Sequence, residues 1–376
     1  MDFTFNEEQQ MLLDSTRRFI AERCGFEARQ RVRSSASGYS RDAWAQLGEL
    51  GLLALNIPEA DGGMGAGAIE TMLVCNAIGE GLLLEPYLSS AVIATHTIAT
   101  LAAEQQRSDW LPRLADGSLI AVLAHDEPGS RFDPTKIQTT AVGDGSHWLI
   151  SGRKSLVYHA PAAGLFLLTA RVRGESADAL SLFAVRSEQA GITLRACATV
   201  DSQRAADIEL DRVSVPRAAR IGVDIRDGLQ AVLDFGLAAL CADAFGALDR
   251  MLKATIEYSR NRVQFGVPIG SFQALQHRMA DMLIQVEQAR SMCYLAASVC
   301  TDPDAAKRRA ALCAAKVLIG QAARFVSQQA VQIHGGMGMT DELSVSHYFK
   351  RLVAFELRMG STDLHLERYR RQMRAA

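Results

Sequence analysis

The spacing of apolar residues changes twice along the sequence, and these changes limit what the chain can fold into. Up to about residue 118, apolar side chains recur every three to four positions, which predicts amphipathic helices. From Leu119 onward, short apolar runs separated by Gly-containing turns predict β-strands. The helical period returns at Gly228 and continues through the rest of the 376-residue chain. The sequence therefore predicts an α+β multidomain protein.

The two changes of period predict three domains in chain order. An N-terminal α-helical domain covers 1–118, a small middle β domain of barrel or sandwich form covers 119–225, and a C-terminal helical bundle covers 226–376. A parallel βαβ sheet is disfavoured because no crossover helices separate the predicted strands. The four or five bundle helices are expected at about 228–258, 271–300, 304–333, 341–357 and 362–373.

Charge and cysteine usage argue against several classes of function. The formal net charge is −2 with acids and bases interspersed, so a nucleic-acid or membrane-surface protein, which needs a basic face, is not expected. The seven cysteines form no CxxC or Cys/His cluster, so neither a metal site nor a disulfide framework is predicted. No apolar run approaches the ~20 residues that span a bilayer. The acidic start at Met1–Thr4 does not resemble a signal peptide, and a cytoplasmic protein without a membrane span is expected.

One connection between two long helical patterns carries unusual residues. Gly266, Pro268 and Gly270 interrupt the helical period within 262–273, because glycine costs helix entropy and proline removes a backbone donor. The plain interpretation is an ordinary loop between antiparallel helices.

Two motifs give this connection a more specific meaning. The first runs through Tyr258, Arg262, Phe265-Gly266, Ile269, Phe272-Gln273 and Ala280-Asp281-Met282. The second is Gln332-Ile-His-Gly-Gly-Met-Gly338, followed by Thr340 and Glu342. Together they resemble the C-terminal signatures of the acyl-CoA dehydrogenase family. The resemblance extends over nearly the whole chain and is closest to the small subunit of pimeloyl-CoA dehydrogenase.

The resemblance implies a helical, β, helical domain order, FAD as cofactor and an acyl-CoA substrate. It also implies electron-transfer flavoprotein as the electron acceptor, and an oligomer formed either with a homologous partner subunit or as a homodimer or homotetramer. In the family's reaction a carboxylate removes the α-proton of the acyl thioester while the β-hydrogen leaves as hydride to flavin N5. Such a site needs a base at the α-carbon, donors at the thioester oxygen and a flavin beside the acyl chain.

The sequence departs from the family at both places where relatives carry the base. The Glu-Gly-Thr triplet of most relatives is matched by Met359-Gly360-Ser361, which keeps a glycine and a hydroxyl but has no carboxylate. The second base position of the family, on the helix before Tyr258, matches Gly236. The catalytic base of this chain is therefore not identified by the resemblance.

Three nearby carboxylates are weak candidates for a displaced base: Asp234, Glu356 and Asp363. A charged residue beside a helix end is more often simply solvated. In relatives an Asp at the position of Asp234 contacts the CoA moiety together with an Arg three residues later, but here that later position is Leu237.

The predicted flavin-ring loop of the middle domain departs as well. Relatives carry Thr-Glu-Pro-Gly-x-Gly-Ser-Asp, whereas this chain has Asp126-Glu-Pro-Gly-Ser-Arg-Phe-Asp133, with an anion in place of the threonine hydroxyl. The family's Trp-Ile-Thr, which follows Gly-x-Lys, is replaced by Leu156-Val-Tyr158 after Gly152-Arg-Lys154. Asp126 and Tyr158 remain the candidate cofactor contacts of this domain, with Ser361 as a third candidate from the C-terminal domain.

By contrast, the residues that serve a neighbouring subunit's flavin in relatives are present. The resemblance assigns Arg262 to the pyrophosphate, since a guanidinium fork suits phosphate oxygens. It assigns the adenosine end to the turn after Gln332, where glycine lets the backbone approach closely. The plain alternatives are a surface cation beside Glu257 and an ordinary helix C-cap. The full set of matching positions is Arg262, Phe265, Gln273, Gln332, Gly335 and Gly336.

Three hypotheses account for this asymmetry. In the first, the chain is the base-lacking subunit of a heteromeric acyl-CoA dehydrogenase and completes its partner's flavin site. In the second, it is a self-sufficient homotetramer with a displaced base. In the third, it is a flavin-free binding or scaffold protein that kept the fold.

Overall fold

The computed structural model describes residues 4–176 and 179–375, and the chain forms two compact units. The helical unit comprises Met1–Gln30, Ala68–Leu83 and Leu237–Ala376. The β unit comprises Arg31–Gly67 and Leu84–Gly236. The long helix α7 (Arg226–Asn261) contributes to both. Neither unit is continuous in sequence, so helices from the two ends of the chain share one core.

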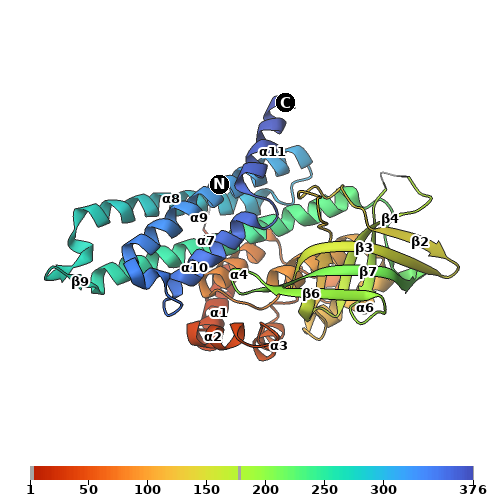
Figure 1. The fold of residues 1–376 in the computed structure, drawn as a ribbon, viewed down its shortest axis with the longest axis horizontal. Coiled ribbons are helices and arrows are strands. Elements are labelled where there is room, and N and C mark those ends of the chain that lie inside the picture. The colour runs from red at the N-terminus through yellow and green to blue at the C-terminus, as the bar shows by residue number, and fades with distance from the viewer. Residues whose placement is uncertain (1–3, 177–178, 376) are drawn as a thin grey trace. The chain divides into compact units, whose positions relative to one another are not determined.

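The helical unit is an antiparallel bundle with two further helices beside it. Its long members are the second half of α7, α8 (Gln273–Val299), α9 (Ala305–His334), α10 (Ser344–Leu357) and α11 (Thr362–Ala375), and α8, α10 and α11 all pack on α9 (Figure 1). The N-terminal helices α1 (Glu7–Arg23) and α4 (Ala68–Gly81) also belong to this unit, and α4 packs on α8. The bundle helices begin and end within a few residues of the predicted ranges.

Helices α4 and α7 approach each other at backbone contact. A Cβ added at Gly79 would collide with the carbonyl of Asp243, and one added at Gly246 would collide with the carbonyl of Asn76. Asp243 also accepts two hydrogen bonds from the guanidinium of Arg351, at 3.0 and 2.8 Å, and both side chains are 7% exposed. The two glycines therefore allow the close crossing of α4 and α7, and the buried ion pair joins α7 to α10.

Within residues 4–176 and 179–375, two helices are long and apolar enough to cross a membrane by length and composition. In α7 the most apolar window is 89% buried, and in the segment Ala305–Met339 that contains α9 it is 61% buried. Core helices of globular proteins are buried to this extent, because other parts of the protein cover their apolar surface. The expectation that no apolar run would approach this length is therefore corrected.

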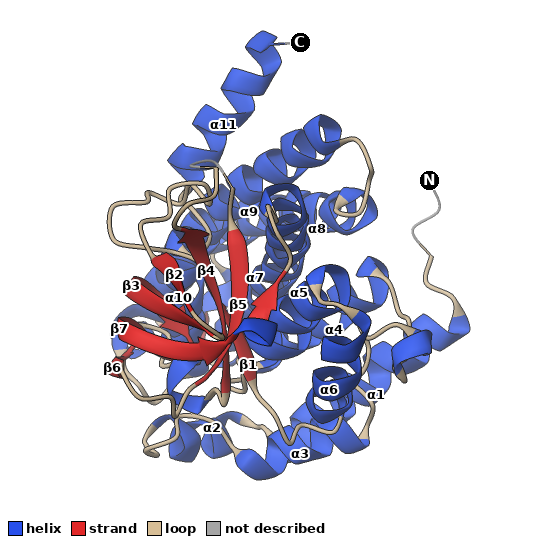
Figure 2. Cartoon of the chain, turned by 90° about the vertical axis from the view of Figure 1, so that its right-hand side faces the viewer, coloured by secondary structure: helices blue, strands red, loops and turns tan. Residues whose placement is uncertain are grey.

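The β unit contains a mixed sheet flanked by short helices (Figure 2). The helices are α3 (Arg41–Glu49), the π-helix Tyr87–Ala94, α5 (Thr95–Leu101) and α6 (Glu104–Ala115). The strands are β1 (Ala121–Ala124), β2 (Thr140–Asp144), β3 (His147–Tyr158), β4 (Leu165–Val172), β5 (Ser181–Arg186), β6 (Ile192–Ala198), β7 (Arg204–Pro216) and β8 (Arg220–Ile221).

The strand order is β6-β7-β3-β2-β4-β5-β8, and β1 pairs with β4 outside this path. Most pairings are antiparallel, as expected for a sheet without crossover helices. Two are parallel: β1 with β4, and the first two residues of β2 with β4. The core on this sheet joins strand residues such as Leu167 and Leu182 to helix residues such as Ile98 and Leu111, none of which is exposed.

We retain 1–118, 119–225 and 226–376 as proposed domain boundaries in chain order. They fall close to element boundaries, since β1 begins at Ala121, β8 ends at Ile221 and α7 begins at Arg226.

Candidate functional site

The connection between α7 and α8 is a small hairpin rather than an irregular loop. Strands β9 (Val263–Gln264) and β10 (Val267–Pro268) pair antiparallel. The two turn residues, Phe265 at φ 54° and Gly266 at φ 81°, are both left-handed, as a tight two-residue hairpin turn requires. Phe265 is 93% exposed, so the hairpin presents a large apolar side chain to its surroundings.

A groove of about 740 Å³ lies in the helical unit between this hairpin, the start of α8 and the end of α9. It brings together most of the predicted nucleotide contacts from two motifs about seventy positions apart in the sequence. Gln273, the first residue of α8, adjoins the groove through Ala274 and Leu275. The predicted residues that line it are Arg262, Phe265, Gln332, Gly335 and Gly336.

The glycine pair at the end of α9 leaves its backbone open. Gly335 has φ 61° and is the C-cap of the helix, so the capping interpretation is correct for this residue. An added Cβ would meet nothing within 4 Å at either Gly335 or Gly336. Gly335 caps the helix, and the space around Gly335 and Gly336 is open. The backbone of both residues is therefore accessible from the groove.

The groove presents a cation that is not neutralised by the chain itself. The side chain of Arg262 is exposed and, among the described residues, forms no hydrogen bond or ion pair with any other group, including Glu257. The nearby His334 ring is stacked on Tyr258 at 4.2 Å between centroids. Burial lowers the pKa of His334, so this wall of the groove is a neutral aromatic pair. An uncompensated guanidinium beside neutral walls favours an anionic ligand.

The turn between α10 and α11 holds the residues at the family's first base position. Met359 has φ 57° and Gly360 has φ 105°, so both are left-handed. His365 donates from Nε2 to the Met359 carbonyl at 2.9 Å. Lys316 Nζ donates to the carbonyl of Phe355, and to that of Arg358 at 3.0 Å. The turn is therefore fixed by buried side chains of α9 and α11, independently of the side chain at position 359.

Glu356 is committed to a structural role in this turn. Its carboxylate accepts the backbone N–H of Thr362 at 2.9 Å and the Thr362 hydroxyl, which caps the N-terminus of α11. The first-turn residue Asp363 is exposed. Asp234 lies in α7 and is 4% exposed, and it accepts a hydrogen bond from Gln230 Nε2 at 2.8 Å. Glu356 is the least available of the three carboxylates for proton transfer.

Gly236, at the second base position, follows an aromatic stack that the sequence did not indicate. Phe235 stacks on His96 of α5, with ring centroids 4.3 Å apart. Burial lowers the pKa of His96 to about 4, so this imidazole is neutral near pH 7. No sequence signal could have found this pair, since the two residues lie far apart in the chain.

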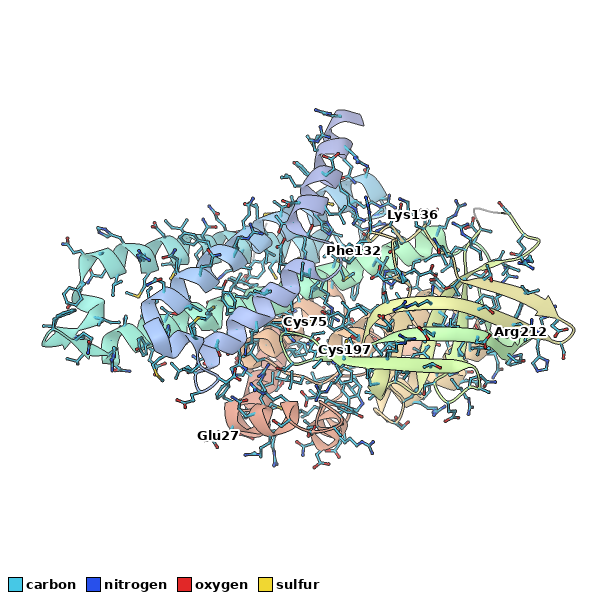
Figure 3. The ribbon with its side chains drawn as sticks, viewed as in Figure 1. Glu27, Cys75, Phe132, Lys136, Cys197 and Arg212 are labelled. Atoms are coloured by element: carbon cyan, nitrogen blue, oxygen red, sulfur yellow. The ribbon has the colours of Figure 1, made fainter. Side chains whose placement is uncertain are left out.

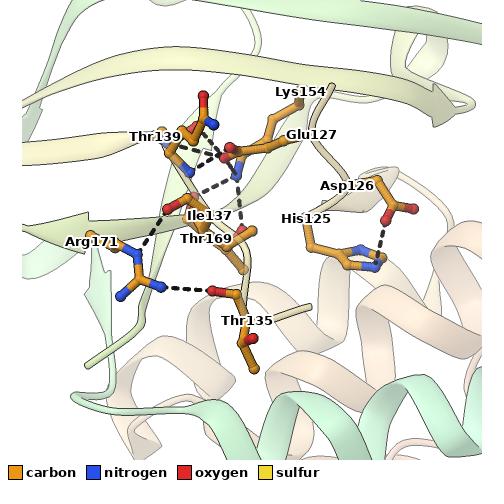
Figure 4. A network of polar contacts seen from close by, with 10 residues as sticks. His125, Asp126, Glu127, Thr135, Ile137, Thr139, Lys154, Thr169 and Arg171 are labelled. Carbon is orange, nitrogen blue, oxygen red and sulfur yellow. Dashed lines mark hydrogen bonds and ion pairs between the residues drawn. The ribbon is translucent and has the colours of Figure 1, made fainter. Parts of the chain in front are cut away.

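The loop from Asp126 to Asp133 in the β unit is anchored by a buried ion pair (Figure 4). The Glu127 carboxylate accepts Lys154 Nζ at 2.7 Å and the backbone N–H groups of Gln138 and Thr139 at 2.6 and 3.1 Å. Lys154 is not exposed, and it also donates to the carbonyl and hydroxyl of Thr169 at 2.7 and 2.9 Å. Glu127 and Lys154 thus fasten the loop to strands β3 and β4.

Burial and charge have opposite effects on the pKa values of Glu127 and Lys154. Burial alone would raise the pKa of Glu127, but the ammonium of Lys154 and the hydrogen bonds it receives lower it on balance. Burial lowers the pKa of Lys154 to about 8, although Glu127 opposes this shift. Both groups are therefore charged at neutral pH. A second anchor is Arg171, which donates to the carbonyls of Ile137 and Thr135 at 2.8 and 2.7 Å.

The loop side chains that differ from the family pattern lie outside this network. The Asp126 carboxylate lies 3.5 Å from His125 Nε2, and its side chain is 34% exposed (Figure 4). Arg131 and Phe132, at φ 51° and 59°, are bulky residues in left-handed conformations, where the family pattern has Gly and Ser. Phe132 is 37% exposed, and Figure 3 marks it on this loop together with Lys136.

The second departure from the family pattern in the β unit lies at the end of β3. Leu156 is left-handed at φ 47° and 51% exposed, and its backbone N–H donates to Asp207 at 2.9 Å. This hydrogen bond and the neighbouring Arg153 lower the pKa of Asp207. Tyr158, the last residue of β3, is half-buried. The structure thus places an exposed aliphatic side chain where the family has a packing tryptophan.

Comparison with known proteins decides the family. Family models of the acyl-CoA dehydrogenase N-terminal, middle and C-terminal domains match residues 6–118, 123–213 and 228–374. The acyl-CoA dehydrogenase fadE12 of Mycobacterium tuberculosis is 34% identical over 319 residues, covering 82% of this chain and 81% of the relative. The chain belongs to the acyl-CoA dehydrogenase family. The predicted fold class is thereby confirmed, as is the assignment to a family of oxidoreductases that bind FAD.

Other relatives and solved structures match over the full length. L-prolyl-[peptidyl-carrier protein] dehydrogenase of Pseudomonas fluorescens is 29% identical and matches over 100% of both chains. The ChsE4-ChsE5 complex from Mycobacterium tuberculosis contains a chain with 27% identity and a TM-score of 0.89, again over 100% of both chains. A glutaryl-coenzyme A dehydrogenase complex with glutaryl-CoA is 26% identical, with a TM-score of 0.89 over 98% of this chain and 95% of that one.

Against the family pattern, the two candidate flavin-binding regions differ in how well they suit FAD. The groove of the helical unit fits a dinucleotide, because it offers an unpaired guanidinium and open glycine backbone. The loop of the β unit does not fit a flavin ring in the usual way. Its Asp126 carboxylate stands where a hydroxyl is expected, and two bulky residues, Arg131 and Phe132, fill the Gly-Ser positions.

Proposed function

We propose that this chain is the base-lacking subunit of a heteromeric, FAD-dependent acyl-CoA dehydrogenase, of the kind represented by the small subunit of pimeloyl-CoA dehydrogenase. The observation that carries the proposal is an asymmetry. The two base positions hold Met359 and Gly236, and neither can accept a proton. The groove around Arg262, in contrast, has an uncompensated cation and an open backbone suited to a dinucleotide.

Two similar solved structures support a heteromer, because each is named for two components. One is the ChsE4-ChsE5 complex, and the other is the Tcur3481-Tcur3483 steroid acyl-CoA dehydrogenase, which is 27% identical with a TM-score of 0.88. Homo-oligomers remain the alternative for the chain itself. In either case the exposed Phe265 hairpin supplies an apolar contact for a neighbouring subunit.

The residues of this chain would hold the partner's FAD rather than act on substrate. Arg262 would contact the pyrophosphate, and the backbone at Gly335-Gly336 with Gln332 would take the adenosine end. Phe265 and Gln273 would line the same ligand, and Ser361 would offer a hydroxyl. When bound, FAD supplies a two-electron acceptor for the hydrogens removed from the acyl chain. The acyl-CoA, the base and the electron-transfer flavoprotein that reoxidises the enzyme would be engaged mainly through the partner.

The experiment is purification of the chain alone and after co-expression with an acyl-CoA dehydrogenase homologue that has an intact Glu-Gly-Thr triplet. We expect the chain alone to be colourless and inactive. The complex should show flavin absorbance and dehydrogenate an acyl-CoA, with one FAD for each pair of chains. Stoichiometric flavin and full turnover by the chain alone would show that the proposal is wrong.

The self-sufficient homotetramer has one observation in its favour. Asp234 is a buried carboxylate two residues before the second base position. Replacing it by asparagine should abolish turnover if it is a displaced base and should leave the heteromer's turnover within about twofold if it is not.

A further inference from the structure

A second guanidinium lines the groove that holds Arg262, and it is not one of the residues that define either family motif. Arg278 lies on α8, five residues after Gln273, and borders the same space of about 740 Å³. Its Nη1 donates to the side-chain carbonyl of Gln329 on α9 at 3.0 Å. This bond orients the guanidinium, so Arg278 is held at the groove by a neighbouring helix rather than moving freely in solvent.

The chain does not neutralise either cation. Among the described residues no carboxylate lies within ion-pairing distance of Arg262 or Arg278, although Asp281 is one helical turn from Arg278. A guanidinium has five N–H donors, and Gln329 takes only one of those on Arg278. Several donors of both side chains therefore remain for a ligand.

Two uncompensated like charges beside one apolar groove repel each other, and a ligand with two negative groups removes that penalty. The remaining walls are apolar or neutral, and the glycine backbone at the far side is open. The apolar lining comprises Phe265, Ile269, Phe272, Leu275, Ile333 and Met337. A flat base with a diphosphate satisfies all of these features, whereas a single phosphate would leave one cation without a partner.

We propose that Arg278 is a second diphosphate-binding residue, so that Arg262 and Arg278 each contact one phosphate of the nucleotide. The inference rests on the proposed function, because it takes the groove to be the binding site for the adenosine diphosphate portion of FAD. It adds a contact that the family motifs do not contain. It also predicts that this groove discriminates strongly between one phosphate and two.

The test measures binding of ADP, AMP and adenosine to the full chain by titration calorimetry. The variants are Arg262→Met, Arg278→Met and, as a matched control, Arg324→Met, an exposed arginine on α9 outside the groove. A charge-assisted hydrogen bond contributes about 1.5–3 kcal/mol, and 1.4 kcal/mol corresponds to tenfold in affinity. Arg278→Met should therefore weaken ADP binding at least about tenfold and remove most of the preference for ADP over AMP, while adenosine binding stays unchanged.

A second variant tests the same point without removing the cation. Gln329→Met takes away the group that orients Arg278, and it should weaken ADP binding by a smaller factor than Arg278→Met does. The co-expressed complex gives an independent readout, since its Arg278→Met form should lose FAD faster on gel filtration than its Arg324→Met form.

The outcomes separate the two proposals. If Arg262→Met loses ADP binding and Arg278→Met does not, the role of Arg278 is wrong and the groove remains a nucleotide site. If the wild-type chain binds no ADP and the Arg262→Met complex keeps its FAD, the nucleotide role of the groove is wrong, and the proposed function fails with it. Equal losses in the Arg324→Met control would show a general charge effect, which also overturns the role of Arg278.

Discussion

Lys154 is the residue on which the candidate flavin-ring loop depends most. It is not exposed, and its only charged partner within bonding distance among the described residues is Glu127. Replacing it by methionine would leave that carboxylate buried and unpaired, so Lys154→Met should destabilise the protein by about 3–5 kcal/mol. Urea unfolding measures this, with Arg153→Met as the control. Arg153 is the exposed neighbour that pairs with Asp207, and its loss should change little.

The buried His365 should make the stability of the protein depend on pH. Burial lowers its pKa to about 4 from 6.5, against the opposing hydrogen bond to Met359, and the cations Lys316 and Arg368 act in the same direction as burial. Between pH 6.5 and 4 the unfolded chain therefore binds a proton that the folded chain does not. Stability should fall as the pH is lowered through this window, with His365 contributing at most about 1.4 kcal/mol per pH unit.

The measurement is the free energy of unfolding at a series of pH values for the wild type and for His365→Gln. The variant should be less stable at pH 7 and should show a shallower slope between pH 6.5 and 4. His96 has a pKa lowered to about 4 for the same reason, so part of the slope should remain. An unchanged slope in His365→Gln would show that this histidine is protonated in the folded state.

A substitution at position 359 tests whether turnover needs a carboxylate there. Met359→Glu restores a carboxylate on a turn whose backbone is already held by Lys316 and His365. In the heteromer we expect no more than about a twofold change in kcat, because the proposed function assigns the catalytic base to the partner subunit. Steady-state turnover of the co-expressed complex checks this, and a large rise in the activity of the variant chain alone would contradict it.

At the scale of elements, the β9–β10 hairpin is the part whose loss should weaken assembly, and with it flavin binding, while leaving the fold of the chain intact. Phe265 is 93% exposed at the tip of the turn, so replacing it costs little within the chain. Phe265→Asp should weaken association with the partner at least about tenfold, as expected for an aromatic anchor in an interface. Size-exclusion chromatography with light scattering measures this. Met64→Asp, at an exposed apolar residue of the β unit, is the control that should leave assembly intact.

The elements differ in how far the sequence could predict them. The bundle helices are long and strongly periodic, so their ranges follow from spacing alone. The ranges of short strands such as β8, β9 and β10 do not follow from the sequence, because two residues carry too little pattern. The π-helix Tyr87–Ala94 was read only as part of a helical region, since its local geometry is set by the surrounding core rather than by its own residues.

The candidate site shows the same limit. The groove residues Arg262, Phe265 and Gln332 could be named in advance because they belong to motifs that are local in sequence. Arg278 could not, because its place depends on the packing of α8 against α9. The role of Glu356 in capping α11 could not be predicted from the sequence either, because it depends on the conformation of the turn at 358–361.

At the scale of the whole molecule, the chain leaves part of its apolar surface uncovered. On α8, Leu283 and Ile284 are 47% and 54% exposed, and Phe272 just before the helix is 37% exposed. These exposed apolar side chains and that of Phe265 all belong to the helical unit, and exposed apolar surface of this kind favours protein–protein contacts. The chain without its partner should therefore self-associate as its concentration rises, and adding the partner should suppress this. Light scattering over a dilution series measures it, and a monomer at every concentration would contradict it.

The turn at 358–361 also has a use in protein engineering. Its backbone is fixed from α9 and α11, so the side chain at 359 can be exchanged without rebuilding the scaffold beneath it. A cysteine placed there could be alkylated with a spectroscopic label or a synthetic catalytic group, because the seven native cysteines are all buried except Cys197. With Cys197 replaced by serine, position 359 would become a single programmable attachment point on an otherwise unchanged subunit.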